Sequence, residues 1–424
     1  MAAVLIFAPG VLGIGPATAE PAAAPAAASD FYQIPSAMPG IDGAVIKTEP
    51  VALLAGSPLA ALAFPASATR IMYQSADTYG APVATTGIVL NPAAPWGGSG
   101  PRPLVSVAVG THGEGDACAP SRLLADGVTV DESGAPAFEM EMADIAALLS
   151  RGIAVVVSDY QGLGTGLVHT YLQPVPEAHA VLDAARAAIR TGVVKPNAPV
   201  GVWGISQGGQ AAGATAERAA GYAPDVDLVG TVVAAPPVSV TATMRNVDGK
   251  FLSGAIGFFV NGLLASHPEL TESIISKLNP AGMDFLRETA QQCAVGIMLT
   301  RSFGPTSKFT VSGQPLTDVL ESDPAIRRVL GSLDLRNGAV PDKPVLLMQN
   351  VHDDVVIPAL TRQLADHWCS NGATVEYPDK VDTPPLLPQI GILGHAAITA
   401  GFDETVQWLV DRFTGHSVPR GCTA

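Results

Sequence analysis

The chain has 424 residues, which is enough for one large domain or about two to three smaller ones. Hydrophobic residues make up 48% of it and charged residues only 14%, a composition that fits a compact globule and excludes an intrinsically disordered chain. The formal net charge of −15 argues against nucleic acid and anionic lipid headgroups as partners.

The N-terminus has the pattern of an export signal. Residues 2–15 (AAVLIFAPGVLGIG) form an apolar run that is too short to span a bilayer as a mature helix, although no Lys or Arg precedes it. Residues 17–19 (ATA) place small side chains at the spacing of a cleavage site. We therefore predict a signal peptide over 1–19, a Pro/Ala-rich tether over 20–40, and a secreted mature protein.

The chain contains four cysteines, and whether they form disulfide bonds depends on the compartment of the protein. An exported chain meets an oxidising environment, so disulfide bonds are favoured over free buried thiols, and three pairings are open. No CxxC pair or Cys/His cluster has the spacing of metal ligands, so we expect no zinc site. The cysteines are Cys118, Cys293, Cys369 and Cys422.

Along the chain, segments typical of buried strands alternate with segments typical of helices. Residues 68–90 contain two strand-like runs around Tyr79-Gly80, the pattern of a hairpin. Continuous apolar runs, typical of strands buried on both faces, follow at 103–110, 153–164, 199–204, 228–237, 343–351 and, in a shorter form, 374–378. Helical spacing marks 177–192, the stretch after Ser206 and roughly 396–413. The alternation predicts an α/β fold with a doubly wound, mostly parallel sheet.

One long segment breaks the alternation. Residues 239–340 lack it, and their core, 251–267 and 273–299, has apolar and amphipathic helical patterns. We predict an inserted helical cap over the C-terminal edge of the sheet. The core domain then has two parts, 41–238 and 341–424, the second with a C-terminal tail. A buried helix pair that continues the main core is the alternative.

The stretch Gly204-Ile205-Ser206-Gln207-Gly208 is a GxSxG match between a predicted strand and a predicted helix. That is the context of a nucleophile elbow, a sharp turn that lifts a serine hydroxyl out of the fold. A serine in a strained backbone needs neighbours without side chains where the chain approaches itself most closely, which accounts for the glycines. We predict that Ser206 is a nucleophile; a glycine turn that serves only close packing is the alternative.

A nucleophilic serine needs a base, and the base needs a carboxylate to orient it. In hydrolases of this architecture the chain order is Ser, Asp or Glu, and His. Asp353 is the first carboxylate after the strand at 343–351, at the end where α/β ligand sites lie, and we favour it as the acid. Asp354 is the alternative, although its place suits a solvated or helix-capping residue.

The base should follow the last predicted strand. Of the eight histidines, only His395 and His416 do so. His395 lies in GILGHAAIT at the mouth of the final helix, whereas His416 lies in the tail. His367 falls within a helix that leads away from the strand end, and His352 adjoins the acid. We therefore predict that His395 is the base.

Two backbone N–H groups are needed to stabilise the negative charge that develops on the substrate. One should come from Gln207, directly after the nucleophile, and the other from the loop after the strand at 103–110. Thr111 and His112 are the nearest candidates in that loop, and Thr111 is preferred. An ordinary flexible loop is the alternative.

Six motifs resemble those of the secretory lipase family of actinobacteria and fungi. In chain order they are CAPS (118–121), SDYQGLG, LDAARAA, GISQGG, HDDVV and GHAA. The resemblance covers about residues 35–415 and is more specific than GxSxG alone. It implies an α/β-hydrolase fold with a helical cap, and hydrolysis of carboxylic esters or triacylglycerols without a cofactor. The disulfides that it implies join Cys118 to Cys293, which ties a loop to the cap, and Cys369 to Cys422.

Carried over to this sequence, the resemblance implies a triad of Ser206, Asp353 and His395. In the family the acid motif usually continues to a proline about one position earlier than Pro358. That departure keeps Asp354 open as the acid.

The prediction is a secreted serine hydrolase that cleaves triacylglycerols or other acyl esters through an acyl-enzyme on Ser206, with His395 as general base. The apolar pair Phe258-Phe259 in the cap favours long acyl chains and contact with a lipid interface. The alternatives are a short-chain esterase, an acyltransferase that uses the same triad on a cell-envelope alcohol, and a catalytically inactive binding protein. No metal, cofactor, nucleic acid or obligate protein partner is expected.

Overall fold

The computed structural model describes residues 30–55, 65–378, 381–384, 387, 390–396, 402–419 and 421–423. The predicted signal peptide and the first part of the predicted tether lie outside the described residues. Residues 31–424 form one compact unit, which contains the sheet, the cap and the candidate site.

Ten described strands form one sheet in the order β1-β2-β3-β7-β4-β8-β9-β10-β11-β12. The pairings β1–β2, β2–β3 and β3–β7 are antiparallel, and every later pairing is parallel. This confirms the predicted doubly wound, mostly parallel α/β architecture. The strands are β1 (Val45–Val51), β2 (Ala66–Ala76), β3 (Pro82–Pro92), β4 (Leu104–Ala108), β7 (Ala154–Gln161), β8 (Val200–Ile205), β9 (Leu228–Ala234), β10 (Val345–Met348), β11 (Val375–Glu376) and β12 (Cys422–Thr423), with β5 (Thr129–Val130) and β6 (Pro136–Ala137) paired separately.

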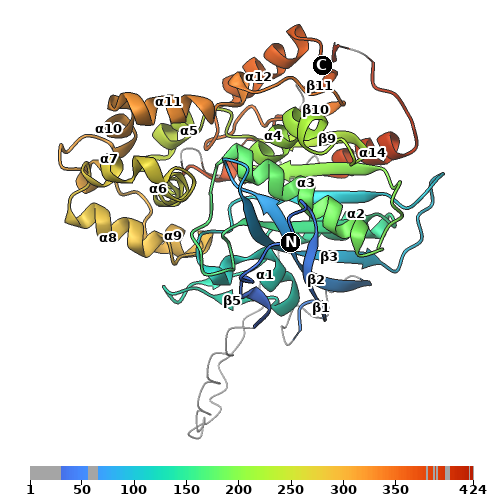
Figure 1. The fold of residues 1–424 in the computed structure, drawn as a ribbon. Helices are drawn as coiled ribbons and strands as arrows, with labels where there is room; N and C mark the ends of the chain where they lie inside the picture. The colour runs from blue at the N-terminus through green and yellow to red at the C-terminus, as the bar shows by residue number, and fades with distance from the viewer. Residues whose placement is uncertain are drawn as a thin grey trace, which may run out of the picture. The chain divides into compact units, whose positions relative to one another are not determined.

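Helices cover both faces of the sheet (Figure 1). On β8, a Cβ atom at Gly201 would meet Leu409 and Phe413 of α14, whereas one at Gly204 would meet the backbone of α4. Residues three apart on a strand point to opposite faces, so α14 and α4 lie on opposite sides of the sheet. The helices of the core are α1 (Pro120–Asp126), α2 (Met142–Ser150), α3 (Pro174–Arg190), α4 (Gln207–Tyr222), α12 (Pro358–Ser370), α13 (Leu393–Ala396) and α14 (Phe402–Phe413).

The chain between β9 and β10 forms a group of helices to one side of the sheet (Figure 1). This is the segment that the sequence predicts as an inserted cap. Its helices are α5 (Val240–Val247), α6 (Ala255–Ser266), α7 (Thr271–Ile275), α8 (Pro280–Thr289), α9 (Ala294–Thr300), α10 (Leu316–Ser322) and α11 (Pro324–Ser332). Within the described part of the chain, no helix has both the length and the apolar character needed to cross a membrane.

The predicted tether joins the fold earlier than residue 40. Phe31 and Tyr32 are buried, and they pack in a small apolar cluster with Met72. The Tyr32 hydroxyl lies 2.9 Å from Ser121 Oγ, and the guanidinium of Arg122 lies 3.6 Å from the centre of the tyrosine ring. The two aromatic rings offer enough apolar surface to anchor a segment whose Pro/Ala content alone predicts a linker.

Two disulfides connect parts of the chain that are distant in sequence, in the pairing that the family resemblance implies. Cys118 and Cys293, with Cα atoms 5.4 Å apart, join the loop after β4 to the start of α9 in the cap. Cys369 and Cys422, with Cα atoms 5.6 Å apart, join the end of α12 to β12. Because each bond closes a long loop, both restrict the unfolded chain and stabilise the fold.

Candidate active site

Ser206 occupies a sharp turn between β8 and α4. Its backbone has φ +59° and ψ −122°, a region that non-glycine residues seldom adopt and that costs about 1–3 kcal/mol. The neighbouring glycines make this turn sterically feasible. A Cβ atom on Gly204 would collide with the carbonyl oxygen of Gly208, and one on Gly208 would collide with the carbonyl oxygen of Ala108. The turn therefore has the strained geometry of a nucleophile elbow, with its hydroxyl at the end of the parallel strands.

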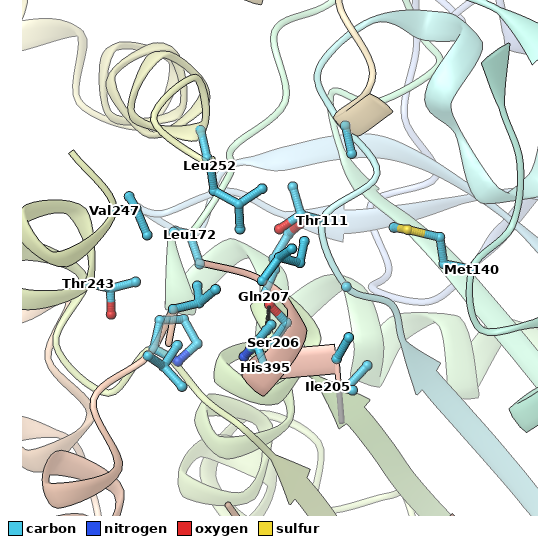
Figure 2. A pocket seen from close by; sticks show the side chains of 18 of the residues that line it. Thr111, Met140, Leu172, Ile205, Ser206, Gln207, Thr243, Val247, Leu252 and His395 are labelled. Carbon is cyan, nitrogen blue, oxygen red and sulfur yellow. Dashed lines mark hydrogen bonds between the residues drawn. The ribbon is translucent and has the colours of Figure 1, made fainter. Parts of the chain in front are cut away.

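The structure brings the three residues predicted as a triad into one hydrogen-bonded chain. Ser206 Oγ lies 2.8 Å from His395 Nε2, and His395 Nδ1 lies 2.7 Å from Asp353 Oδ2. The serine comes from the turn before α4, the histidine from α13 and the aspartate from the loop after β10. Figure 2 shows Ser206 and His395 side by side at the bottom of a pocket. The arrangement can pass a proton from a serine hydroxyl to an imidazole.

Asp353 is fixed by four hydrogen bonds. Its Oδ1 accepts from the backbone N–H groups of Val355 and Val356, each at 2.9 Å. Its Oδ2 accepts from Gln349 Nε2 at 2.8 Å and faces His395. Burial alone would lower the pKa of His395, but the charge and hydrogen bond of Asp353 outweigh it and raise that pKa above its ordinary value. An imidazolium at this position is thereby stabilised.

Asp354 has a different surrounding from its neighbour. Its Oδ2 accepts from the N–H groups of Gly391 and Ile392, and its Oδ1 accepts from the backbone N–H of His395 at 3.1 Å. It neither faces solvent freely nor caps the next helix, contrary to the expectation from its sequence position. Its carboxylate fixes the backbone that carries the histidine, whereas the carboxylate of Asp353 contacts the imidazole itself.

The other histidines weighed as the base lie elsewhere. His352 pairs with Asp382 at 2.6 Å in an exposed position. His416 contacts Thr414 on the surface, and His367 lies in the last turn of α12. Of the histidines considered, only His395 is within hydrogen-bond distance of Ser206.

The two residues predicted to donate to an oxyanion, Thr111 and Gln207, both line the pocket beside Ser206. Within the described residues, the backbone N–H groups of both have no hydrogen-bond acceptor. Donors left free next to a nucleophile suit the stabilisation of a developing negative charge. The alternative candidate, His112, does not line this pocket, and its side chain faces two buried glutamates.

A largely apolar cavity of about 200 Å³ lies above Ser206 and His395 (Figure 2). The cap and the core contribute to it from several separate segments. The apolar lining includes Val247 of α5, Leu252 before α6, Ala255 of α6, Ala294, Ile297 and Met298 of α9, and Met140, Leu172, Ile205 and Val356 of the core. Such a lining suits the hydrocarbon part of a ligand.

The phenylalanine pair expected to line this cavity does not do so. Phe258 and Phe259 are 0% and 2% exposed and belong to the main hydrophobic core. The Phe258 ring meets Tyr171 edge-on, with centroids 5.8 Å apart. Leu252 and Ala255, at the start of the same segment, face the cavity instead. An apolar helix can be covered on all sides by protein, so its composition does not indicate which face meets a ligand.

A buried polar network under the pocket was not foreseen from the sequence. The Gln207 side-chain amide donates to Glu177 Oε1 and to His169 Nε2, each at 2.8 Å. The same glutamate oxygen accepts from the N–H of Leu172, a pocket residue whose φ is +56°. Burial raises the pKa of Glu177 to about 8 and lowers that of His169 to about 4. The network therefore holds both Gln207 and a strained part of the pocket wall.

Known lipases resemble this chain in sequence. The sequence profile of the secretory lipase family matches residues 132–421. A protein of Mycobacterium tuberculosis named a probable inactive lipase is 32% identical over 83% of this chain and 74% of its own length. Lipase A of Arthroderma benhamiae is 29% identical over 95% of this chain and 83% of its own length.

A solved structure resembles the whole unit. Lipase A of Candida antarctica in its closed state superposes with a TM-score of 0.77 at 22% identity, covering 92% of this chain and 86% of that one. At this identity the likeness establishes the fold alone, which is the α/β-hydrolase fold predicted from the sequence.

Proposed function

This chain belongs to the secretory lipase family, and we propose that it is a secreted serine hydrolase that cleaves acyl esters. Family membership supports ester hydrolysis. The observation that carries the finer proposal is the hydrogen-bonded chain Ser206–His395–Asp353 at the bottom of an apolar cavity. The family's name, the two disulfides and the N-terminal export pattern support secretion.

The reaction follows from the positions of these groups. Ser206 Oγ attacks the ester carbonyl carbon while His395 Nε2 takes the hydroxyl proton, and Asp353 stabilises the resulting imidazolium. The carbonyl oxygen becomes an oxyanion that accepts hydrogen bonds from the N–H groups of Thr111 and Gln207. When the intermediate collapses, His395 gives its proton to the departing alcohol oxygen and an acyl-enzyme forms. His395 then deprotonates a water, which attacks the acyl carbon and forms a second tetrahedral intermediate. This intermediate breaks its bond to Ser206 Oγ, His395 returns the proton to that oxygen, and the carboxylic acid leaves.

The cavity supports an ester with a hydrocarbon acyl chain as the substrate. Its walls from α5, α6 and α9 present aliphatic side chains directly above Ser206. An acyl chain placed there exchanges water for apolar contacts, at about 25 cal/mol for each Å² buried. The relative from Arthroderma benhamiae carries the name lipase. We propose triacylglycerols or other acyl lipids as substrates, and contact with a lipid interface when they are bound.

The test is a series of p-nitrophenyl esters from acetate to palmitate, followed by triacylglycerol emulsions. We expect hydrolysis of the esters, with kcat/KM rising as the chain lengthens until the cavity is filled. Transfer of the acyl group to an added alcohol in preference to water would identify an acyltransferase. A purified, folded protein that hydrolyses none of these esters would contradict the proposal.

Leu252 is expected to determine part of the preference for acyl-chain length, because its side chain lies over Ser206 in the cavity (Figure 2). We expect Leu252→Ala to lower kcat/KM for a decanoate or palmitate ester by about fivefold to tenfold relative to acetate. That ratio corresponds to about 1 kcal/mol of lost apolar contact, part of the value of a fully buried leucine. Steady-state kinetics on the ester series measures it.

Phe258→Ala is the matched control, since Phe258 lies in the same segment but not in the cavity. Truncating this fully buried ring should cost about 3–5 kcal/mol of stability. At a temperature where the variant stays folded, its rates on acetate and palmitate should fall equally, if at all. A selective loss on palmitate in Phe258→Ala, with none in Leu252→Ala, would contradict the assignment of the cavity wall.

A further inference from the structure

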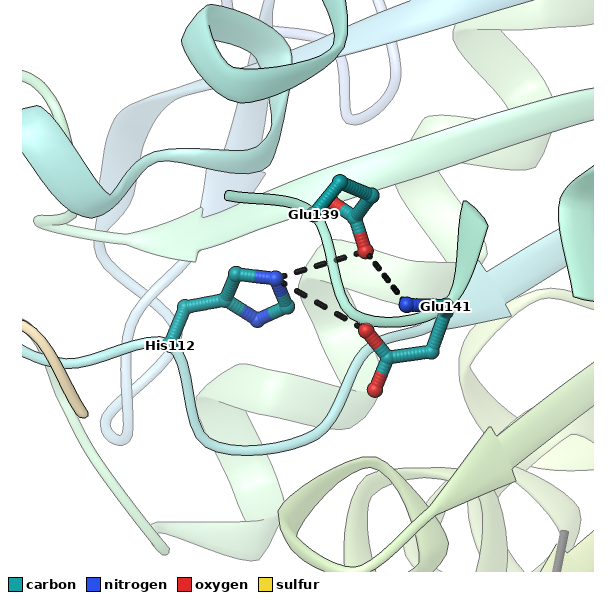
Figure 3. Close-up of side chains that lie close together, drawn as sticks. All are labelled: His112, Glu139 and Glu141. Atoms are coloured by element: carbon teal, nitrogen blue, oxygen red, sulfur yellow. Dashed lines mark hydrogen bonds and ion pairs between the residues drawn. The ribbon is translucent and has the colours of Figure 1, made fainter. Parts of the chain in front are cut away.

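Three ionisable side chains lie together in the interior beside the candidate oxyanion loop (Figure 3). His112, Glu139 and Glu141 are all buried. His112 Nε2 is 3.3 Å from Glu139 Oε1 and 3.7 Å from Glu141 Oε2. The proposed ester hydrolysis uses none of these three side chains. Burying three ionisable groups lowers the stability of the fold unless their charges neutralise one another.

The cluster holds both polar atoms of one backbone residue. Glu141 Oε1 accepts from the N–H of Gly110 at 2.8 Å, and His112 Nδ1 lies 3.0 Å from the Gly110 carbonyl oxygen. The backbone N–H of Glu141 donates in turn to Glu139 Oε1 at 3.2 Å. Gly110 directly precedes Thr111, the residue whose N–H is proposed to donate to the oxyanion. The cluster therefore fixes the peptide that orients this donor.

The charges in the cluster balance. Burial alone would lower the pKa of His112, but the charge of Glu139 raises it to about 10. Burial would raise the pKa of Glu139, but His112 holds it below its ordinary value. Burial raises the pKa of Glu141 to about 8. At neutral pH the cluster thus consists of an imidazolium, a carboxylate and a carboxylic acid, with no net charge.

The cluster is poorly arranged for stability alone. His112 Nε2, Glu139 Oε2 and Glu141 Oε2 are buried without a well-formed hydrogen bond to any described residue. A buried polar atom without a hydrogen bond lowers the stability of the fold, and well-packed apolar residues in its place would often stabilise the fold equally well. A function in positioning explains why the well-formed bonds of His112 and Glu141 converge on Gly110. Oxyanion donors act through such preorganisation.

We propose that His112, Glu139 and Glu141 act as one positioning unit, which holds Gly110 so that the N–H of Thr111 points at the oxyanion. The inference rests on the proposed function. Glu141 also lines the pocket. In this scheme the three residues act through the backbone of the loop and take no part in proton transfer or bond formation. A second contact, between Thr111 Oγ1 and the Tyr171 hydroxyl at 2.7 Å, holds the same loop from the side of the pocket.

The test compares Glu141→Leu with Glu141→Gln. Leucine removes the acceptor for the Gly110 N–H, whereas glutamine keeps a neutral oxygen in its place. We expect Glu141→Leu to lower kcat by about 10-fold to 100-fold with KM changed less than twofold, since misplacing a reacting group by about 1 Å costs rate on this scale. Glu141→Gln should stay within about threefold of the wild type. The affinity for an alkyl trifluoromethyl ketone, which forms a tetrahedral adduct, should fall in Glu141→Leu as much as kcat/KM.

Glu217→Gln is the matched control, because Glu217 of α4 is also buried with a pKa raised to about 8 but pairs with Arg218 outside the pocket. It should leave kcat unchanged. A readout independent of turnover is amide hydrogen exchange in the peptide 104–112, which should quicken in Glu141→Leu and not in Glu217→Gln. This measurement judges the unit even in a protein that hydrolyses no ester, so the two proposals fail separately.

Three results would overturn the proposal. The first is equal damage from Glu141→Gln and Glu141→Leu. The second is a fall in kcat of Glu141→Leu while the amide hydrogen exchange of peptide 104–112 and the affinity for the ketone both stay unchanged. A general loss of packing would then explain the lower kcat. The third is one equivalent of a divalent metal in the purified wild type that is absent from Glu141→Gln, because the cluster would then be a metal site.

Discussion

Ser206→Ala is expected to reduce kcat for ester hydrolysis by about 10⁴-fold to 10⁶-fold, the scale on which serine triads lose activity without their nucleophile. Alanine has no hydroxyl, so neither the acyl-enzyme nor the proton transfer to His395 can occur. The strained backbone at this position accepts alanine as it accepts serine, because both carry a Cβ atom. Thermal unfolding should therefore show a folded variant with nearly the stability of the wild type.

Labelling by a fluorophosphonate separates loss of the nucleophile from loss of the fold. The probe should modify Ser206 in the wild type and leave Ser206→Ala unmodified. Ser253→Ala is a suitable control, since Ser253 is a buried cap serine that donates to the carbonyl oxygen of Gly304. The Ser253→Ala variant should keep its activity. Labelling of Ser253 in the wild type would contradict the assignment of Ser206 as the nucleophile.

The similarity to a protein of Mycobacterium tuberculosis gives the labelling experiment a second purpose. A protein from that organism that is 32% identical to this chain is named a probable inactive lipase. In this chain His395 lies 2.8 Å from Ser206 on one side of its ring and 2.7 Å from Asp353 on the other. A wild type that neither hydrolyses esters nor reacts with the probe would show that this geometry is not sufficient, and would favour the inactive binding protein.

Parts of the site could be predicted because local sequence decides them. The elbow needs glycine on both sides of Ser206, and the strand before it and the helix after it have distinct periodicities. The order of strands places an acid and then a histidine at the same sheet edge. The family resemblance implied the two disulfide pairings that the structure has.

Other parts depend on packing that sequence patterns do not encode. Phe258 and Leu252 are both apolar cap residues, and only the path of the chain shows that one lies in the core and the other in the cavity. Glu139 and Glu141 alternate with methionines in FEMEM, a pattern that also suits an exposed strand. Their burial beside His112 follows from the loop after β4 folding back over them. They lie far along the chain from His112, so no local pattern in the sequence joins the three residues.

Sequence position alone does not separate the two adjacent aspartates, whereas their contacts differ. The aspartate that we propose as the acid gives the second large expected effect. Asp353→Asn is expected to lower kcat by about 10⁴-fold. The asparagine amide would donate to His395 Nδ1 in place of accepting from it. That contact favours the tautomer with its proton on Nε2, which cannot take the proton of Ser206. Rates measured from pH 6 to 9 should show the loss throughout, because it concerns the tautomer and not only the charge.

Asp354→Asn is expected to cost much less, about 10-fold to 100-fold in kcat, because the Asp354 carboxylate accepts only backbone N–H groups of the segment that carries His395. The amide oxygen can still accept from one side of that segment, but the NH₂ group meets donors on the other, so the loop shifts without changing the tautomer. Asp382→Asn provides the control, since Asp382 also pairs with a histidine, His352, but on the surface. It should leave kcat unchanged. If Asp354→Asn proves more damaging than Asp353→Asn under the same conditions, the wrong neighbour has been assigned as the acid, because only a carboxylate that bonds to the imidazole controls its tautomer.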